Sequence, residues 1–421
     1  MKKAVKPRKT KQQKVLDAVD AALTEVNGKS AYTKIDFADT KTAFAGKSDA
    51  DLKKAQWLFR MMSRPTLVNL GTSLGMIALK LRLPFTEKII KETIFSQFVG
   101  GRTLLESQTA IEELEKQNVL TILDYGAEAK TTEEDYNKTM NENIRAIEFA
   151  AGNASVPIIS TKVTGMARFG LLESVSRNEP FTKATRREYK IVLKRLDSIC
   201  HTARERGVGV FFDAEETWIQ DAIDHFTDVM MRRYNREKAI VYNTFQMYRK
   251  DRLPYLLSSF DRAQKHGYIL GAKLVRGAYM EKEAERAEEM DYPNPIHPTK
   301  AATDDAYNQA VRFCVENYER LASCNASHNA ASAQLQARLI AEKGLPKNHP
   351  HLNFCQLYGM SDNLTFNLAD AGYNVAKYVP YGSIKEVVPY LIRRANENTS
   401  VSGDMTRELS FITEEVKRRG I

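Results

Sequence analysis

The spacing of apolar residues divides the chain into two parts of different texture. Up to residue 98, apolar positions recur every three or four residues, as they do along one side of an α-helix. The segment DADLKKAQWLFRMMSR (49–64) begins with a capping aspartate, and TEKIIKETIFSQFVGG (86–101) ends at paired glycines. The apolar run at 67–85 contains Lys80 and Arg82 and is too short to span a bilayer. We therefore predict helices over residues 13–98, with the 67–85 segment packed on the main domain.

Short apolar or β-branched runs alternate with longer amphipathic segments after Gly101. Such alternation is typical of a parallel (β/α)8 barrel of the TIM type. An open doubly wound sheet is the rival, but neither G-x-G-x-x-G nor a P-loop occurs, and GVGV at 207–210 opens a strand. We predict an α/β fold with a helical subdomain at 1–98 and a catalytic barrel at 99–421. The eight predicted strands are VLTILDYG, VPIISTKVTG, VGVFFDAEE, AIVYNTFQMY, YILGAKLVRGAY, LASCNASHN, HLNFCQLYGM and YNVAKYVPYG, followed by helices at 133–151, 183–206, 216–236, 252–266, 300–320, 330–343, 361–371 and 383–399.

Composition agrees with a soluble protein of 421 residues, since 43% are hydrophobic and 27% charged. Much of the net charge of +9 lies in the first stretch, MKKAVKPRKTKQQK, which contains no acidic residue. We interpret it as a solvated tail and expect no nucleic-acid binding, because the remaining charge is nearly balanced. The four cysteines form no CxxC pair, and no apolar core follows the basic start, so we expect a reduced intracellular compartment, the cytoplasm.

Polar side chains recur where the predicted strands end. In a parallel barrel these ends meet at one mouth, which is where the chemistry of such barrels lies. Each of them alone would more often be a rim residue, but their convergence predicts a ligand site. A metal site is not expected, because the His349 and His351 pair precedes its strand and therefore lies at the opposite face. The strand-end residues are Asp124, Glu128, Lys162, Asp213, Glu215, Glu216, Gln246, Lys273, Arg276, His328, Asn329, Gln356 and Tyr378.

The segment YLIRRANENTS (390–400) places four functional groups on one stripe of the last predicted helix. Tyr390 lies three and four positions before Arg393 and Arg394, and Glu397 lies four and three positions after them. Taken alone, this stripe could be a solvated helix end with an ion pair. The alternative is a guanidinium pair that binds an anion.

Eight ordered stretches of this chain resemble the proline dehydrogenase family, whose members use FAD to begin proline catabolism. The resemblance covers roughly residues 100 to 400, and the phrases GAKLVRGAY and KYVPYG are closest to the branch found in eukaryotes and some bacteria. It implies a distorted (β/α)8 barrel with the flavin across its mouth. The matching stretches are LDYGAEA, IISTKVT, FFDAEET, GAKLVRGAYMEKE, ASHN, QLYGM, YVPYG and YLIRRANEN.

The resemblance also implies roles for individual residues. Asp213 and Lys273 would be the catalytic pair, although many bacterial members have arginine instead of this lysine and a lysine lacks the bidentate fork. Lys162, Arg393 and Arg394 would bind the substrate carboxylate, with Tyr378, Tyr390, Leu357 and Tyr279 as further substrate contacts. The flavin contacts would be Ala214, Gln246, Val275, Gly277, Ala278, Tyr279, Ser327 and His328, with Glu397 aligning a guanidinium beside them.

The reaction implied is oxidation of L-proline to 1-pyrroline-5-carboxylate, with electrons passed from FAD to membrane quinone. Contact with the inner membrane through the basic N-terminus or the 67–83 segment would follow, and a eukaryotic host would place the protein in mitochondria. Hydroxyproline dehydrogenase is a related alternative, although Tyr378 should crowd a ring hydroxyl. Two further alternatives are a Schiff-base aldolase using Lys162 or Lys273 and a non-enzymatic binding scaffold.

Overall fold

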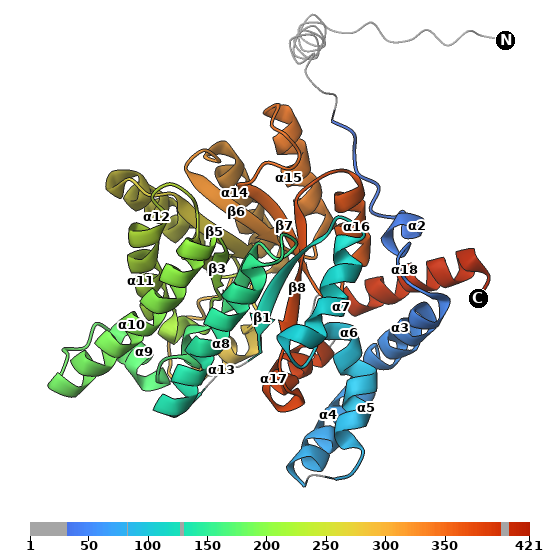
Figure 1. The fold of residues 1–421 in the computed structure, drawn as a ribbon, viewed down its shortest axis with the longest axis horizontal. Coiled ribbons are helices and arrows are strands. Elements are labelled where there is room, and N and C mark those ends of the chain that lie inside the picture. The colour runs from blue at the N-terminus through green and yellow to red at the C-terminus, as the bar shows by residue number, and fades with distance from the viewer. Residues whose placement is uncertain (1–31, 82, 127–129, 397–403) are drawn as a thin grey trace, which may run out of the picture.

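A closed barrel of eight parallel strands forms the centre of the computed structural model (Figure 1), which describes residues 32–81, 83–126, 130–396 and 404–421. Consecutive strands pair in sequence order, and the barrel closes where Ile122 of the first strand pairs with Tyr378 of the last. The predicted barrel is therefore confirmed. The strands are β1 (Leu120–Tyr125), β2 (Ile158–Thr161), β3 (Gly209–Phe212), β4 (Val241–Gln246), β5 (Leu270–Val275), β6 (Leu321–Ala326), β7 (Leu352–Leu357) and β8 (Val375–Tyr381).

A helix follows each strand and covers the outside of the barrel. Strands β3, β4 and β8 are buried along their whole length, since their two faces pack against the barrel interior and the surrounding helices. Three short elements between a strand and its helix were not predicted: η2 (Val163–Gly165), α9 (Phe169–Ser176) and α13 (Met280–Glu289). The outer helices are α8 (Glu133–Ala151), α10 (Lys183–Arg206), α11 (Thr217–Tyr234), α12 (Arg252–His266), α14 (Lys300–Glu316), α15 (Ala330–Glu342), α16 (Asp362–Asp370) and α17 (Ile384–Asn396).

Short helices precede the barrel and pack beside its last helices. Helix α3 is capped by Ser48, whose side chain and that of Asp51 form a capping box, so the cap lies one residue before the predicted aspartate. Residues 32–39 are not helical, contrary to the prediction, and residues 13–31 lie outside the described part. The elements are α2 (Thr40–Ala43), α3 (Asp49–Met62), α4 (Pro65–Lys80), α5 (Thr86–Ile90), η1 (Lys91–Phe95), α6 (Ser96–Phe98) and α7 (Leu104–Glu115).

The chain ends in a helix that the sequence pattern did not reveal, α18 (Asp404–Arg419), which packs on α3 (Figure 1). One apolar core joins these helices, since Phe44, Leu52 and Phe59 cluster with Leu391 of α17 and Ile412 of α18. The N-terminal helices therefore share a core with the C-terminal end of the chain. Within the described residues, no helix is both long enough and apolar enough to cross a bilayer.

Candidate active site

Side chains from four strands or strand ends meet at the carboxylate of Asp213, which directly follows β3. Its Oδ1 accepts hydrogen bonds from Ser160 Oγ at 2.8 Å and from Lys273 Nζ at 2.6 Å. Its Oδ2 accepts one from the hydroxyl of Tyr378 at 2.6 Å and lies 3.9 Å from Nζ of Lys162. The structure therefore unites four of the predicted residues, Asp213, Lys273, Lys162 and Tyr378.

The two lysines of this cluster determine the charge state of Asp213. Burial by itself would raise the pKa of Asp213, but Lys273 and Lys162 outweigh it and hold that pKa below its usual range. Lys273 Nζ also lies 4.6 Å from the ring centroid of Tyr378 and 5.3 Å from that of Phe211. The carboxylate is therefore ionised at neutral pH and holds the ammonium groups in position.

Two more buried carboxyl groups lie near this cluster. Burial raises the pKa of Asp124, at the end of β1, to about 6, and no partner within the described residues bonds its Oδ1. Burial likewise raises the pKa of Glu215 to about 7, although the backbone N–H and hydroxyl of Thr164 both donate to its carboxylate. Gln246 Nε2 donates to the backbone oxygen of Glu215 at 2.7 Å. Asp124 and Glu215 can therefore exchange protons near neutral pH.

A second polar cluster lies beyond β6. His328 Nδ1 is 2.8 Å from Ser361 Oγ, and that hydroxyl donates to Oε1 of Glu408 at 3.0 Å. If the single hydroxyl proton goes to Glu408, then His328 must donate through Nδ1, which leaves its Nε2 as an acceptor. Burial, followed by Arg394 and Lys377, holds the pKa of His328 well below its usual range. The imidazole is therefore neutral.

Helix α18, near the C-terminal end of the chain, completes this second cluster. Arg407 Nη2 donates to the backbone oxygen of His328 at 3.0 Å, and burial raises the pKa of Glu408 to about 7. Both residues belong to α18. Ser361, in the left-handed conformation with a φ of 51°, precedes α16. No strand-end pattern pointed to these three residues, since two come from a helix beyond the barrel and one from a loop.

The turn after β5 presents backbone at the barrel mouth. Gly277 and Ala278 are exposed, and Gly277 has a φ of 143°, where a Cβ atom would meet the ring of Tyr248 at 2.5 Å. The guanidinium of Arg276 is fixed by Asp304 at 2.7 Å and by the hydroxyl of predicted Ser327 at 2.6 Å. The turn leads into α13, which begins four residues after Arg276.

This mouth has the donor set that a dinucleotide needs. Arg276 and the start of α13 suit a pyrophosphate, and the exposed backbone of Gly277 permits a close approach. The buried Asp124 Oδ1 and Thr244 Oγ1 also have no hydrogen-bond partner within the described residues. The other predicted cofactor residues lie at the same strand ends: Ala214 follows β3, Gln246 ends β4, Val275 ends β5, Tyr279 precedes α13, and His328 follows β6. The residues present therefore fit such a group.

The predicted carboxylate clamp lies on α17. Arg394 is buried, and its guanidinium carbon lies 5.2 Å from the ring centroid of Tyr390, which itself packs into the core shared with the N-terminal helices. Arg393 is half-buried on the same helix, while predicted Glu397 lies outside the described residues. Leu357, at the end of β7, pairs in register with Tyr378. The assignment of these residues to the substrate stays a prediction.

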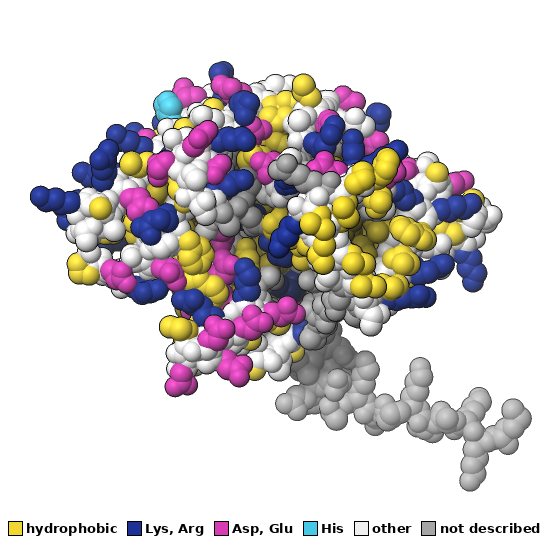
Figure 2. Space-filling view, turned by 90° about the horizontal axis from the view of Figure 1, so that it is seen from below, with side chains coloured by type: hydrophobic (Ala, Val, Ile, Leu, Met, Phe, Trp, Pro, Cys, Tyr) yellow, Lys and Arg dark blue, Asp and Glu magenta, His cyan; other side chains and the backbone are white. Residues whose placement is uncertain are grey.

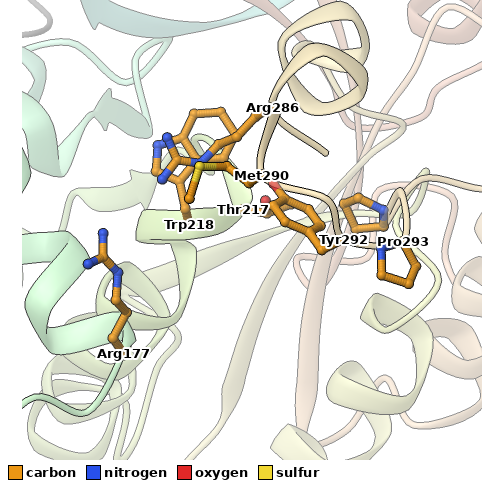
Figure 3. A pocket seen from close by; sticks show the side chains of 8 residues that line it. Arg177, Thr217, Trp218, Arg286, Met290, Tyr292 and Pro293 are labelled. Atoms are coloured by element: carbon orange, nitrogen blue, oxygen red, sulfur yellow. The ribbon is translucent and has the colours of Figure 1, made fainter. Parts of the chain in front are cut away.

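A separate cavity of about 460 Å³ lies beside the start of α11 and the end of α13 (Figure 3). The guanidinium carbon of Arg286 is 4.4 Å from the ring centroid of Trp218, and both line this cavity. None of the predicted site residues lines it. The histidine pair stays distant from both clusters: His351 Nδ1 bonds to the backbone oxygen of Tyr318 at 2.7 Å, before β7. No group of three or more potential metal ligands occurs within the described residues.

Comparison with known proteins gives three informative matches. A family model described as proline dehydrogenase matches residues 107–407. "Proline dehydrogenase 1, mitochondrial" of Dictyostelium discoideum is 34% identical over 374 residues, which cover 78% of this chain and 65% of that protein. "Carbapenem antibiotics biosynthesis protein CarD" of Pectobacterium carotovorum subsp. carotovorum is 31% identical over 362 residues, covering 86% of this chain and 94% of that protein. This chain thus spans less than two thirds of the length of the Dictyostelium relative.

A solved structure shows the same fold. The crystal structure of proline utilization A (PutA) from Bdellovibrio bacteriovorus, inactivated by N-propargylglycine, has a TM-score of 0.67 at 22% sequence identity. The superposition covers 93% of this chain and 42% of that one. This likeness supports the barrel and its surrounding helices.

Proposed function

Because this chain belongs to the proline dehydrogenase family, we propose that it oxidises L-proline to 1-pyrroline-5-carboxylate. The reaction removes a hydride from the ring carbon beside nitrogen and a proton from the amine. FAD, when bound at the mouth, supplies the two-electron acceptor. The observation that supports this proposal best is the cluster of Ser160, Lys162, Lys273 and Tyr378 around the carboxylate of Asp213, at the barrel mouth.

The chain's own residues position the substrate. Asp213 holds the side chains of Lys273 and Lys162 in place, and Lys162 with Arg393 and Arg394 would bind the proline carboxylate. Fixing the carboxylate away from the reacting carbon orients the ring for hydride departure. Asp124 and Glu215, whose pKa values burial raises to about 6 and about 7, are suited to take up the amine proton.

The visible spectrum of the purified protein tests this proposal. We expect a yellow protein whose absorbance bleaches on addition of L-proline under anaerobic conditions. A colourless protein, or a yellow one that proline does not reduce, would refute the assignment. Borohydride trapping with a carbonyl substrate tests the aldolase alternative, which the geometry does not favour because the Lys273 amine donates to Asp213 at 2.6 Å.

Tyr378 favours proline over hydroxyproline. Its side chain is buried in the barrel interior and its hydroxyl is held by Asp213, so it cannot turn away from a larger ring. Turnover of proline should therefore exceed that of trans-4-hydroxyproline, and replacement of Tyr378 by serine should narrow this difference in turnover. A parent enzyme that prefers hydroxyproline would overturn this choice.

The partners and compartment follow from the same premise. We infer that the reduced flavin passes its electrons to a membrane quinone, and that the protein works at the cytoplasmic side of an inner membrane or, in a eukaryotic host, inside mitochondria. The relative from Dictyostelium is named as mitochondrial. The division into a helical unit at 1–98 and a catalytic unit at 99–421 also stays a prediction.

A further inference from the structure

The cavity at the end of α9, the start of α11 and the end of α13 has an unusual set of charges. Among the described residues that line it, both charged side chains are arginines. Elsewhere on the face of the molecule that carries α13, Lys and Arg side chains are interspersed with Asp and Glu side chains (Figure 2). The lining therefore differs from the surrounding surface in having charges of one sign. We call it the arginine cavity, and its lining residues are Arg177, Thr217, Trp218, Arg286, Met290, Tyr292, Pro293 and Pro295.

A carboxylate outside the lining fixes the two arginines. Nη2 of Arg286 lies 3.0 Å from Oε1 of Glu173, and Nη2 of Arg177 lies 3.3 Å from the same oxygen. Arg177 also pairs with the exposed Glu179 at 3.3 Å. A guanidinium group has five N–H donors, so these contacts leave donors on both arginines. Two guanidinium groups held by one shared oxygen are positioned in advance for a carboxylate or phosphate group.

The other walls of the cavity are aromatic and apolar. The guanidinium carbon of Arg286 lies 4.4 Å from the ring centroid of Trp218, so the cation packs on the indole. Figure 3 shows Arg177 on one side of the cavity and Tyr292 and Pro293 on the opposite side. Aromatic side chains offer flat apolar surfaces against which another planar ring can pack. The cavity therefore combines places for a flat ring and for an anionic group.

Hydrogen bonds hold the loop that forms the far wall. The backbone N–H of Lys250 donates to the backbone oxygen of Pro295 at 3.0 Å, and that of His297 donates to the backbone oxygen of Tyr248 at 2.7 Å. These two bonds fix the loop on both sides of Ile296. A cavity with fixed walls loses little conformational freedom when a ligand enters.

We propose that the arginine cavity binds a small planar aromatic anion. The ring packs against Trp218 and Tyr292, and the anionic group accepts hydrogen bonds from Arg177 and Arg286. The volume of about 460 Å³ is in the range of sites for small molecules. Nucleoside monophosphates and aromatic carboxylates share this chemistry. The experiment below distinguishes between these two sources.

Two contacts connect the arginine cavity to the barrel mouth. Thr217, which lines the cavity, lies four residues after Asp213 on the connection from β3 to α11. Its backbone N–H and its hydroxyl donate to the fully buried carboxylate of Glu283 at 2.8 Å and 2.6 Å. Glu283 and Arg286 both belong to α13. A ligand that contacts Arg286 and Thr217 would therefore stabilise the packing of α13 on the connection that carries Asp213. A resulting change in KM for proline rests on the proposed function, whereas the binding itself does not.

Tryptophan fluorescence of the flavin-loaded full chain tests the binding. The chain contains two tryptophans, Trp57 and Trp218, and Trp57 is 53% exposed on α3. The Trp57→Phe variant therefore reports on Trp218 alone. Adenosine 5′-monophosphate or benzoate should change its fluorescence in a saturable way. Adenosine and inorganic phosphate should each bind more weakly than adenosine 5′-monophosphate, because each has only one of the two groups that the cavity accepts.

Arginine variants in the Trp57→Phe background locate the site. Arg177→Met should weaken binding at least about tenfold, because it removes a charge-assisted contact. Arg177 is largely exposed, so the variant should fold normally. The matched control Arg168→Met removes an exposed arginine at the other end of α9, which pairs with Glu188, and should bind like its parent. Response to the nucleotide alone would assign the cavity to nucleoside monophosphates, and response to benzoate alone would assign it to aromatic carboxylates. Absence of both responses, or equal affinity in the two arginine variants, would overturn the proposal.

Oxidation of proline with a soluble dye separates this proposal from the proposed function. The ligand that binds should change KM for proline in the parent, and the change should be smaller in Arg177→Met than in Arg168→Met. Proline oxidation without binding of either anion would refute the site alone. Binding without reduction by proline would refute the proposed function alone, and binding with an unchanged KM would refute the link to the barrel mouth.

Discussion

At the scale of single residues, the carboxylate of Asp213 organises the barrel mouth. Ser160, Lys273 and Tyr378 contact it from three strands, and Lys162 lies next to it. A buried carboxylate without such partners would be neutral. The cluster therefore keeps a fixed pattern of charge at the barrel mouth.

The two arginines of α17 give the first prediction. Replacement of Arg393 or Arg394 by methionine removes charge-assisted hydrogen bonds worth about 1.5–3 kcal/mol each, so kcat/KM for proline should fall roughly 10- to 100-fold, mainly through KM. Steady-state kinetics with a soluble dye measures this. Arg338→Met removes an exposed arginine paired with Glu342 on α15 and should have no effect. Unchanged KM in both α17 variants would refute the clamp.

Glu408 gives a prediction about pH. Burial raises the pKa of this carboxyl to about 7, so between about pH 4.3 and 7 the folded state keeps a proton that the unfolded state loses. The free energy of unfolding therefore falls as pH rises through this range. The Glu408→Gln variant has no carboxyl group to titrate at this position. Its free energy of unfolding relative to that of the parent should therefore increase by up to about 3 kcal/mol from pH 4 to about pH 8.

Denaturant unfolding of Glu408→Gln and the parent at several pH values measures this difference. Glu414→Gln, an exposed position on the same helix, is the control and should show no such trend. A relative stability of Glu408→Gln that does not change with pH would contradict the proposed burial of a titrating carboxyl group.

At the scale of elements, the turn between β5 and α13 combines an unusual backbone conformation at Gly277 with close contact between this glycine and a tyrosine ring. Gly277 lies against the ring of Tyr248, and its φ of 143° is one that other residues rarely adopt. Both features restrict this position to glycine.

Replacement of Gly277 by alanine should destabilise the protein by about 3 kcal/mol, because a Cβ atom both clashes and strains the backbone. The control is Gly207→Ala at the end of α10, where φ is 71° and nothing lies within 4 Å of the added atom. That change should cost only about 1 kcal/mol. Thermal unfolding measures both, and the ratio of visible to protein absorbance should show flavin loss in Gly277→Ala alone. Equal effects would argue against a special role of the turn.

At the scale of the whole molecule, the C-terminal helix α18 contacts the segment from α2 to the start of α3. Arg419 of α18 donates to the backbone oxygens of Phe44 at 2.7 Å and Lys47 at 2.9 Å, and it pairs with Asp49. The same helix supplies Arg407 and Glu408 to the cluster at His328. Helix α18 therefore links the N-terminal helices to the barrel mouth.

Arg419→Ala should lower the free energy of unfolding by about 2–3 kcal/mol, since it leaves carbonyl groups near Phe44 and Lys47 without their donor. Arg418→Ala is the matched control, because Arg418 pairs with the same Glu415 but is 46% exposed, and it should cost less than about 1 kcal/mol. Limited proteolysis should cleave α2 and α3 faster in Arg419→Ala. Similar losses in the two variants would contradict the proposed linking role.

The sequence by itself determined the barrel and most of its mouth. Alternation of short β-branched runs with amphipathic segments dictates eight β-then-α units, and parallel closure brings residues such as Asp213, Lys273 and Tyr378 to one end whatever the details of packing. The resemblance to a family then added their roles. Local pattern was sufficient here because the side-chain periods of strand and helix depend on neighbouring residues only.

Only the tertiary structure decided the contacts that cross from one part of the chain to another. Ser361 lies 33 residues after His328 and contacts it, and Glu408 lies a further 47 residues along and accepts from Ser361, so no local period encodes this meeting. The exposed apolar side chains of α4 likewise have the same spacing as those of a buried helix, so only packing distinguishes a surface from a core. Burial is a property of the folded whole, and it sets both the pKa values near 7 and which apolar side chains of α4 stay exposed.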